Sequence, residues 1–391
     1  MARNAASVPA LVAIVFALVA PSARAGDVSV QLDSGAGFSL KNSTGAIERL
    51  RVDEATGNVS RNGLLFVHTT GTQNLFVGQA AGNTTLTGGY NVGIGLNALF
   101  KDTSGAFNVA VGRAALASNL TGSFNTAVGY NALSANATGG NNSAFGLAAL
   151  QSNTGSGNTA VGTNALRSNI TGSDNQAFGL SALTTNTTGL RNVAVGRTAL
   201  YANTSGSRNV AVGFGAGASQ TTGNDNIYLA NAGVAGESGQ IKIGTVGTHT
   251  AATIAGISGA TSVGGVAVLV NASGELGTTT SSARFKEDVR DMADASDVLR
   301  KLRPVVFRYR EDAVGAEEAK TTQYGLIAEE VEQVAPELVA NDLDGKPYSV
   351  KYHELPALLL NELQKTERTV EAQRQEIALL RARLEKVEAG R

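Results

Sequence analysis

A 17-residue internal repeat occupies the middle of the chain, and it restricts the possible folds more than any other feature. Asparagine and glycine both recur with this period, with one step of 16 residues. The asparagine series is Asn74, Asn91, Asn108, Asn125, Asn142, Asn158, Asn175, Asn192 and Asn209. The glycine series is Gly78, Gly95, Gly112, Gly129, Gly146, Gly162, Gly179, Gly196 and Gly213. One such unit cannot bury its own apolar face, whereas a stack of units can, so the period predicts a solenoid.

Each unit contains the pattern of one short strand, as in the string TGSFNTAVGYNALSANA. In N-x-A-V-G, small and β-branched residues alternate as they do in a strand, and the T-G between units is typical of a turn. The asparagines predict a ladder of side-chain amides along the solenoid axis. A leucine four residues after most of the glycines predicts one inward apolar side chain per coil. These leucines are Leu99, Leu116, Leu133, Leu150, Leu166, Leu183 and Leu200.

The irregular copies indicate where the coils turn and where the stack closes. The short step falls between Leu150 and Gly155, and a deletion accepted there indicates a surface turn. Asn226 lies one further period on, but Ala230 replaces the glycine, as in a degenerate closing copy. The predicted fold class is therefore mainly β, with a parallel β-solenoid over residues 71–230, which we call the stem.

Composition excludes several other classes of protein. The 47 glycines do not recur at every third position, which excludes collagen. Hydrophobic residues make up 42% of the chain, which argues against disorder. The formal net charge of −1 favours neither nucleic-acid nor membrane-surface binding. No cysteine is present, so disulfides cannot stabilise the fold, and stability must come from packing and association.

The repeat motif N-x-A-V-G-x-x-A plus a turn, over residues 71–217, resembles the head repeats of trimeric autotransporter adhesins. Only eight residues in this range are charged. As a monomer, a stem with so little charge and so many small apolar residues would expose adhesive surface. We therefore expect the chain to be its own partner, in a homotrimer.

The N-terminus has the pattern of a secretory signal peptide over residues 1–25. Arg3 supplies the positive start, Val8 to Ala20 is apolar, and Ala23-Arg24-Ala25 is a small-x-small cleavage site. The apolar run is too short for the roughly 20 residues of a membrane span, and no later segment is long and apolar enough. An uncleaved anchor is the alternative. We expect export, to the medium or to the cell surface, and no membrane span after signal removal.

Two further segments flank the stem. Residues 26–70 are predicted to form a short β-rich cap, and residues 231–280 a β-rich neck and linker. Within the neck, Ile241–Ile243 and Val268–Val270 have the pattern of strands. Gly277–Thr280 is predicted to be an open, flexible approach to the next domain, because it has little structure of its own to lose.

From residue 281 onward the composition inverts, and 40 of 111 residues are charged. Residues 281–352 are predicted to form a small α+β domain. Its elements are a helix over 297–302 that stops before Pro304, strands over 305–309, 323–328 and 348–352, and a short helix over 329–334.

Residues 353–391 are predicted to form a trimeric coiled coil. A heptad pattern places apolar residues on one seam and a mixed set on the other, with charged residues at most remaining positions. Pro356 is acceptable in the first helical turn. A packed single helix is the alternative. The first seam holds Leu363, Val370, Ile377 and Leu384, and the second holds Thr366, Gln373, Leu380 and Val387.

Ser281 and Lys286 stand in the string SSARFKEDVR, where the low-charge stem region meets the charged domain. A serine hydroxyl is a poor nucleophile without a base, and a lysine acts as a base only when neutral. Burial favours the neutral amine. A serine and a lysine five residues apart at a domain junction therefore point to a chain that cuts itself there.

Four strings place this domain in a known context: S-x-x-R-F-K-E-D from Ser281, Q-Y-G-L-I-A-E-E-V from Gln323, P-E-L-V from Pro336, and V-K-Y-H-E-L before the coil. Residues 281–391 resemble the intramolecular chaperone domain of phage endosialidases and tail fibres, a self-cleaving serine–lysine peptidase. The resemblance implies a trimer that guides folding of the upstream fibre and then severs itself beside Ser281.

In that family the residues matching Ser281 and Lys286 are the nucleophile and the base. The resemblance thus implies a single-turnover endopeptidase without activity on other substrates. One departure is Ser282, where the family often has aspartate directly after the nucleophile.

Two other functions compete with a self-processing fibre. One is a surface adhesin, in which the C-terminal domain is an uncleaved trimerisation clamp and the stem binds a cell-surface or matrix ligand. The other is a conventional enzyme with its site in the stem. The three histidines His68, His249 and His353 lie far apart in the sequence, and no motif for a metal or a cofactor occurs, so we expect neither.

Overall fold

The computed structural model describes residues 38–41, 48–53, 55–62 and 64–389. The chain divides into two units, Met1–Thr245 and Val246–Arg391, and each is described by itself. The predicted signal peptide, residues 1–25, lies outside the described residues.

The first unit opens with an antiparallel meander. Its strands are β1 (Phe38–Lys41), β2 (Glu48–Val52), β3 (Val59–Arg61) and β4 (Leu64–His68). Each strand pairs antiparallel with the next, and β4 pairs antiparallel with β5. The direction of pairing changes at β5, which is parallel to β6 and begins the solenoid.

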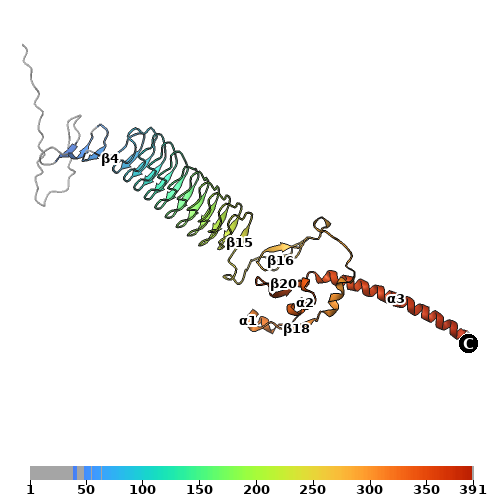
Figure 1. Ribbon diagram of the computed structural model, residues 1–391. Helices are drawn as coiled ribbons and strands as arrows, with labels where there is room; N and C mark the ends of the chain where they lie inside the picture. The colour runs from blue at the N-terminus through green and yellow to red at the C-terminus, as the bar shows by residue number, and fades with distance from the viewer. Residues whose placement is uncertain (1–37, 42–47, 54, 63, 390–391) are drawn as a thin grey trace, which may run out of the picture. The chain divides into compact units, whose positions relative to one another are not determined.

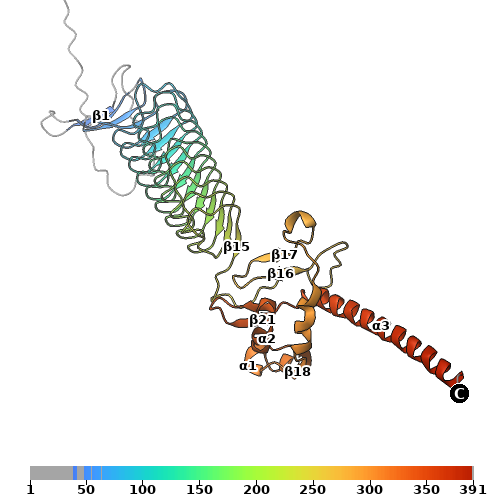
Figure 2. The same cartoon turned by 45° about the vertical axis from the view of Figure 1, so that its right-hand side comes forward.

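The solenoid consists of one three-residue strand per coil, and Figures 1 and 2 show the coils stacked along one axis. Every strand from β5 to β15 is parallel to the next, so the predicted parallel β-solenoid is confirmed. The repeat sets the register, with Ala177 opposite Ala194 as an example. The strands are β5 (Leu75–Val77), β6 (Val92–Ile94), β7 (Val109–Val111), β8 (Thr126–Val128), β9 (Ser143–Phe145), β10 (Thr159–Val161), β11 (Gln176–Phe178), β12 (Val193–Val195), β13 (Val210–Val212), β14 (Ile227–Leu229) and β15 (Ile241–Ile243).

The interior of the solenoid has an apolar core of alanine and leucine, flanked by buried polar side chains. The predicted inward leucines are all fully buried, and the alanine at the centre of most strands packs beside them. Larger side chains replace that alanine near the two ends, where Phe76 in the first strand and Tyr228 in the last strand but one are also fully buried. An aromatic ring at each end fills space that a neighbouring coil fills elsewhere, as terminal repeats commonly do.

The predicted asparagine ladder is present, and each rung is bonded to both neighbours. The Oδ1 of Asn175 accepts hydrogen bonds from the backbone N–H of Asn192 at 2.9 Å and from its Nδ2 at 3.1 Å. The Nδ2 of Asn175 donates to the carbonyl of Gly189 at 2.8 Å and to the Oδ1 of Asn158 at 3.3 Å. Each buried amide therefore satisfies the polar groups of the next, which offsets the penalty of burying them.

A second buried ladder runs parallel to the first and was not predicted. Its amides also bond from coil to coil, as in Asn186, whose Nδ2 donates to Asn169 Oδ1 at 2.6 Å and to the Gly189 carbonyl at 3.1 Å. Both ladders thus converge on the same glycine carbonyls. The rungs are Asp102, Asn119, Asn136, Asn153, Asn169, Asn186, Asn203 and Gln220, and all are fully buried.

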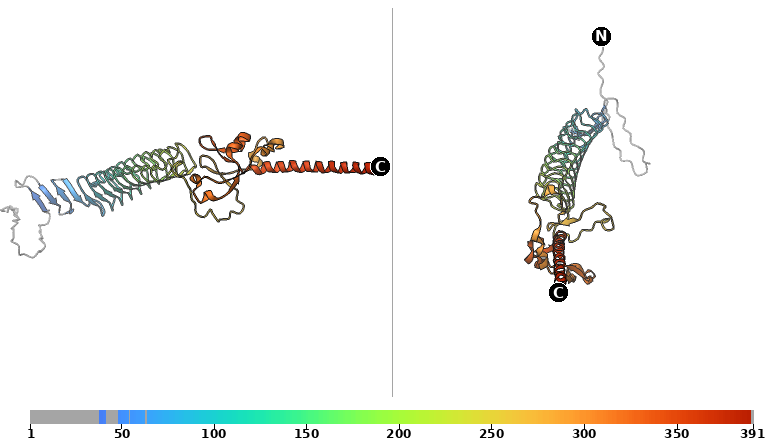
Figure 3. Two further views of the ribbon diagram at one scale, coloured as in Figure 1. Left: turned by 90° about the horizontal axis from the view of Figure 1, so that it is seen from below. Right: turned by 90° about the vertical axis from the view of Figure 1, so that its right-hand side faces the viewer.

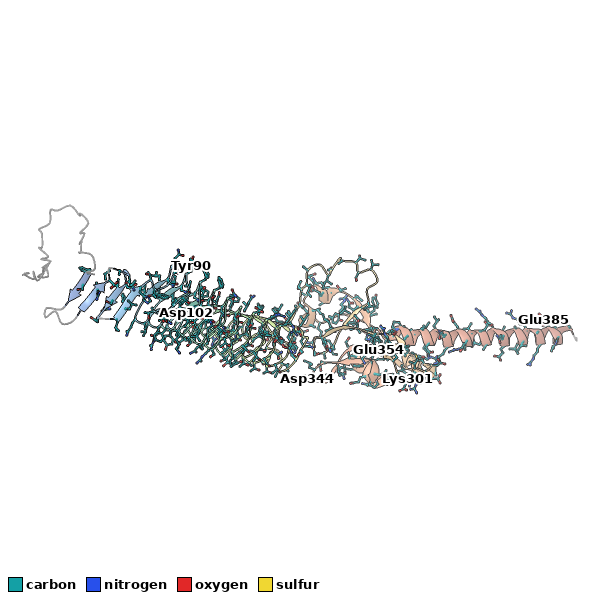
Figure 4. The ribbon with its side chains drawn as sticks, turned by 90° about the horizontal axis from the view of Figure 1, so that it is seen from above. Tyr90, Asp102, Lys301, Asp344, Glu354 and Glu385 are labelled. Atoms are coloured by element: carbon teal, nitrogen blue, oxygen red, sulfur yellow. The ribbon has the colours of Figure 1, made fainter. Side chains whose placement is uncertain are left out.

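Asp102 places a carboxyl group where the other rungs have an amide (Figure 4). Its Oδ1 accepts a hydrogen bond from the Gly105 backbone at 2.8 Å, but its Oδ2 is buried without a partner. In the next coil the amide nitrogen of Asn119 donates to the carbonyl of Gly122. Burial raises the pKa of Asp102 to about 7, because a carboxylate there is desolvated.

Replacing Asp102 with asparagine is expected to remove a pH dependence of stability. The folded-state pKa lies above the ordinary value of 3.8, so the wild-type group stabilises the fold fully below about pH 4. That contribution is lost as the pH rises to about 7, on the order of 2–4 kcal/mol in total. Thermal unfolding of both chains from pH 4 to pH 8 measures the difference.

The matched control is Asn119→Asp in the Asp102→Asn background, which moves the carboxyl group to the next rung and should restore the pH dependence. Parallel pH profiles for wild type and Asp102→Asn would contradict the prediction.

The second unit holds the remaining elements. They are β16 (Val268–Val270), β17 (Leu276–Thr278), η1 (Ala283–Phe285), η2 (Ala293–Lys301), β18 (Val305–Phe307), α1 (Glu311–Val314), η3 (Glu318–Lys320), β19 (Gln323–Gly325), α2 (Ala328–Val334), η4 (Pro336–Leu338), β20 (Val339–Asn341), β21 (Pro347–Val350) and α3 (Leu355–Ala389). Strands pair antiparallel as β16–β17, β18–β19 and β20–β21. Figure 3 shows α3 as one continuous helix.

One part of the neck differs from the prediction. Gly277 and Thr278 were expected to be open chain, but they belong to β17, which pairs with β16 through Leu269 opposite Gly277. The Asn271 side chain organises the turn between the strands by accepting hydrogen bonds from the backbone of Ser273 and Glu275. Hairpin pairing with β16, which is visible as a strand in the sequence, thus overrides the weak strand propensity of glycine.

A small core and one polar cluster hold the second unit together. The buried core comprises Val331, Ala335, Leu338, Val339 and Val350. The base of α3 is joined to η2 through Glu362, which accepts hydrogen bonds from Ser296 at 2.7 Å and Lys365 at 2.9 Å and pairs with Arg300. These partners, with the Ser296 hydroxyl first, lower the pKa of Glu362 to about 2.

Candidate active site

Ser281 and Lys286 are brought together by one turn of 3₁₀ helix. The turn is η1, in which the backbone N–H of Phe285 donates to the carbonyl of Ser282 at 3.0 Å, and that of Lys286 donates to Ala283 at 3.1 Å. The turn reverses the chain between the two side chains. As a result the Lys286 Nζ donates a hydrogen bond to the Ser281 Oγ at 3.3 Å.

This pair has the composition of a nucleophile and its base, but it is open to solvent in the single chain. Both residues are exposed, as is every other residue from 271 to 290. The distance of 3.3 Å is slightly longer than the 2.6–3.2 Å typical of a working base, and such bonds often tighten only in the reactive complex. The geometry therefore supplies proximity, and burial would have to come from assembly.

The chain that leads into the pair is accessible. After β17, Thr279 and Thr280 belong to no helix or strand and are exposed. The peptide bonds beside Ser281 are thus free of backbone pairing within a sheet. A segment of this kind can adjust its backbone to an attacking hydroxyl without breaking a strand.

Ser282, which stands where an aspartate was expected from the resemblance, begins the turn. Its backbone is extended, and its side chain makes no capping hydrogen bond. Two residues on, the Arg284 guanidinium lies 4.7 Å from the centre of the Phe285 ring, a cation–π contact.

The predicted sequence strings supply the framework behind the pair. Val331 from Q-Y-G-L-I-A-E-E-V and Leu338 from P-E-L-V are both in the buried core. The backbone N–H of Leu326 donates to the Tyr352 hydroxyl at 2.9 Å, which joins the first of these strings to V-K-Y-H-E-L. Arg303 forms a two-pronged ion pair with Glu330. Residues from the three strings are therefore joined within one small module.

The site and fold together define a class: a parallel β-solenoid joined to a small α+β module that begins with a serine–lysine pair. Comparison with protein families is more specific. Residues 281–340 match the family described as chaperone of endosialidase, and the match begins at Ser281. This segment of the chain is therefore similar to that family, and a solenoid stem before it is consistent with a protein of the tail-fibre type.

The match ends at residue 340, so the string V-K-Y-H-E-L and the helix α3 lie beyond it. Neither the curated proteins nor the solved structures give a match to this chain. The likeness of the repeats to autotransporter heads consequently stays a prediction.

A conventional enzyme with its site in the stem would need a cluster of catalytic side chains there. The exposed stem carboxylates Asp225 and Asp174 instead pair with arginines, Asp225 with Arg208 at 2.5 Å and Asp174 with Arg191 at 4.0 Å. Across the described ranges, histidine, aspartate and glutamate form no group that would bind a metal ion. Nor does any helix in the described part of the chain have both the length and the apolar character needed to cross a membrane.

Proposed function

We propose that this chain is an exported homotrimeric fibre protein whose C-terminal domain directs trimer folding and then cuts itself off beside Ser281. The observation that carries the proposal is the family match that begins at Ser281, combined with the placement of Lys286 Nζ 3.3 Å from the Ser281 Oγ. The activity is a single-turnover endopeptidase reaction on the chain itself.

In the proposed reaction, neutral Lys286 takes the proton of the Ser281 hydroxyl as the Oγ adds to the carbonyl carbon of the scissile peptide bond. The C–N bond then breaks, and the leaving amine takes the proton from the lysine ammonium. Water hydrolyses the resulting ester, which frees the Ser281 hydroxyl and leaves a carboxylate on the other fragment. Desolvation of Lys286 on trimer assembly favours its neutral form, so cleavage would depend on correct assembly.

Two uncovered apolar surfaces of the second unit support the trimer. The helix α3 has no buried residue, and its predicted seam is open, with Leu363 56% and Leu384 58% exposed. In the α+β part, Tyr324 and Tyr348 are about four-fifths exposed beside a core of only a few side chains. A module with so little buried area is marginal alone and gains stability by association. The heptad pattern of α3 would place its seams against two further copies.

The alternative function is a surface adhesin in which the C-terminal domain remains attached as a trimerisation clamp. The observation that favours it is Ser282, at the position where the related domains often carry aspartate. In that case the stem would bind a cell-surface or matrix ligand. Export is common to both functions and rests on the signal-peptide pattern of residues 1–25.

The test is to express residues 26–391, measure the intact mass of the denatured product, and run an unboiled sample on a gel. We expect two fragments that meet at or beside Ser281, with the stem fragment migrating as a trimer. A single uncut trimeric chain would contradict self-cleavage and favour the clamp. An uncut chain that is also monomeric would contradict both functions.

A further inference from the structure

One outer surface of the solenoid is apolar from end to end. We call it the strand face, formed by the outward first and third residues of strands β5 to β15. The third residue of each of these strands is apolar. These residues are Val77, Ile94, Val111, Val128, Phe145, Val161, Phe178, Val195, Val212, Leu229 and Ile243. These side chains are half-buried or exposed, and the first residues beside them carry no charge.

The surface that follows the second ladder has the opposite character. Threonine and serine side chains there bond to the backbone of the next coil, as in Thr154, whose hydroxyl donates to the Ile170 carbonyl at 2.8 Å. Thr187 donates in the same way to Thr204 at 2.9 Å. The hydroxyls of this polar surface are already paired, and its exposed apolar side chains, such as Leu120 and Ile170, are interrupted by threonine in other coils. The strand face, in contrast, is a continuous apolar patch of the kind that marks an interaction surface.

The strand face is large enough to supply the larger part of an interface with a second copy of the same stem. Stacked rings at the solenoid edge give the coil spacing directly: the ring centres of Tyr90 and Phe107 are 4.8 Å apart, and those of Phe107 and Phe124 are 5.1 Å apart. At about 4.8 Å per strand the face is roughly 48 Å long, and three residues at about 3.3 Å each make it roughly 10 Å wide, which gives on the order of 500 Å² for a flat surface. A stable interface buries about 800 Å² per partner, so the strand face would supply the larger part of such an interface and not all of it.

The period and the lack of charge also favour a copy over other partners. A surface that repeats every coil is matched along its whole length only by a partner with the same spacing. The absence of charged residues gives an anionic partner such as nucleic acid nothing to bind, whereas two copies meet without repulsion. Association through the C-terminal domain would raise the local concentration of stems to the millimolar range.

We propose that the strand face is the surface through which three copies of the stem pack against one another. This inference rests on the homotrimer of the proposed function and adds which side of each solenoid faces the other copies. The corresponding prediction is that side chains of the strand face are protected from solvent reagents in the assembled protein, although the single chain leaves them open.

The absence of cysteine from the chain allows a clean test with single-cysteine variants. Val161→Cys lies on the strand face, and Ile170→Cys lies on the polar surface of the following turn. In the single chain these two positions are 38% and 49% exposed, so a monomer would let both thiols react with a maleimide at similar rates. We expect the Val161→Cys thiol to react at least about tenfold more slowly in the assembled residues 26–391.

The mass of the same samples, measured by sedimentation, separates the possible failures. A trimeric mass with equal thiol reaction rates would overturn the strand-face proposal and leave the trimer intact. A monomeric mass would overturn both. Protection of both thiols would also overturn it, because the polar surface would then be covered as well.

Lysine substitution provides an independent measurement at the same two positions. Val161→Lys places a charge within the proposed interface, whereas Ile170→Lys adds the same charge to a surface that is expected to remain exposed to solvent in the trimer. We expect only the first to lower the fraction of stem that migrates as a trimer on an unboiled gel, by at least about twofold. Equal trimer fractions for the two variants would contradict the proposal.

Discussion

Replacing Ser281 with alanine is expected to leave the mature chain intact. The substitution removes the hydroxyl that lies 3.3 Å from the Lys286 Nζ, and with it the nucleophile of the proposed reaction. Loss of a catalytic nucleophile slows a serine peptidase by roughly 10⁴-fold or more, which is complete inactivation on the time scale of expression. Intact-mass measurement of the denatured product will show one chain of full mature length.

Two substitutions at neighbouring positions are the controls. Ser282→Ala leaves the serine–lysine contact in place and should still be cut, since the Ser282 side chain makes no capping bond. Lys286→Met removes the base and should prevent cleavage without preventing assembly. Cleavage of Ser281→Ala at the same bond would show that Ser281 is not the nucleophile, and loss of cleavage in Ser282→Ala alone would transfer that role to Ser282.

The second large effect is expected from Gly162→Ala in the middle of the stem. The backbone of Gly162 has φ +133°, a conformation that residues with a side chain rarely adopt. An added Cβ would also lie 2.5 Å from the carbonyl oxygen of Gly179 and 2.7 Å from its carbonyl carbon. Because the obstacle is backbone of the next coil, the coils must separate. We expect a loss of at least about 3 kcal/mol in the free energy of unfolding.

Gly215→Ala is the matched control for that substitution. Gly215 also has a positive φ, +63°, but a Cβ added there would meet no atom within 4 Å. It should therefore show only the backbone penalty, about 1–2 kcal/mol. Chemical unfolding of both variants, followed by circular dichroism, measures the difference, and equal losses would mean that contact between coils does not explain the repeated glycine.

The features of the stem that depend on strict repetition were predictable from the sequence. A residue that returns every coil must occupy the same place in every coil, so the inward leucines and the first asparagine ladder follow from the period alone. The second ladder was missed because its column begins with Asp102 and ends with Gln220, which hides the repetition. Phe76 and Tyr228 were missed for a related reason. In the sequence, the repeat units that contain them look like irregular copies. The folded solenoid is needed to show that the two rings fill the core near its ends.

The candidate site was predictable in its residues but not in its geometry. Ser281 and Lys286 stand out by type, spacing and position at the junction. The contact between them requires the 3₁₀ turn η1, and a turn of three residues is too short to be predicted from a periodic pattern. The hairpin of β16 and β17 was likewise hidden, because Gly277 and Thr278 form a strand only through pairing with residues several positions upstream.

Because each coil of the solenoid contributes one strand, the number of repeats sets the length of the stem. Each coil pairs only with its two neighbours. The rings of Phe76 and Tyr228 fill the core near the two ends, and their packing does not depend on how many coils lie between them. Duplication or deletion of one 17-residue unit would therefore lengthen or shorten the stem by one strand spacing, about 4.8 Å, with both ends unchanged. Insertion or deletion of repeat units in the gene can thus change the length of the stem in small, equal steps. Each new coil packs against its neighbours in the same way as the existing coils do.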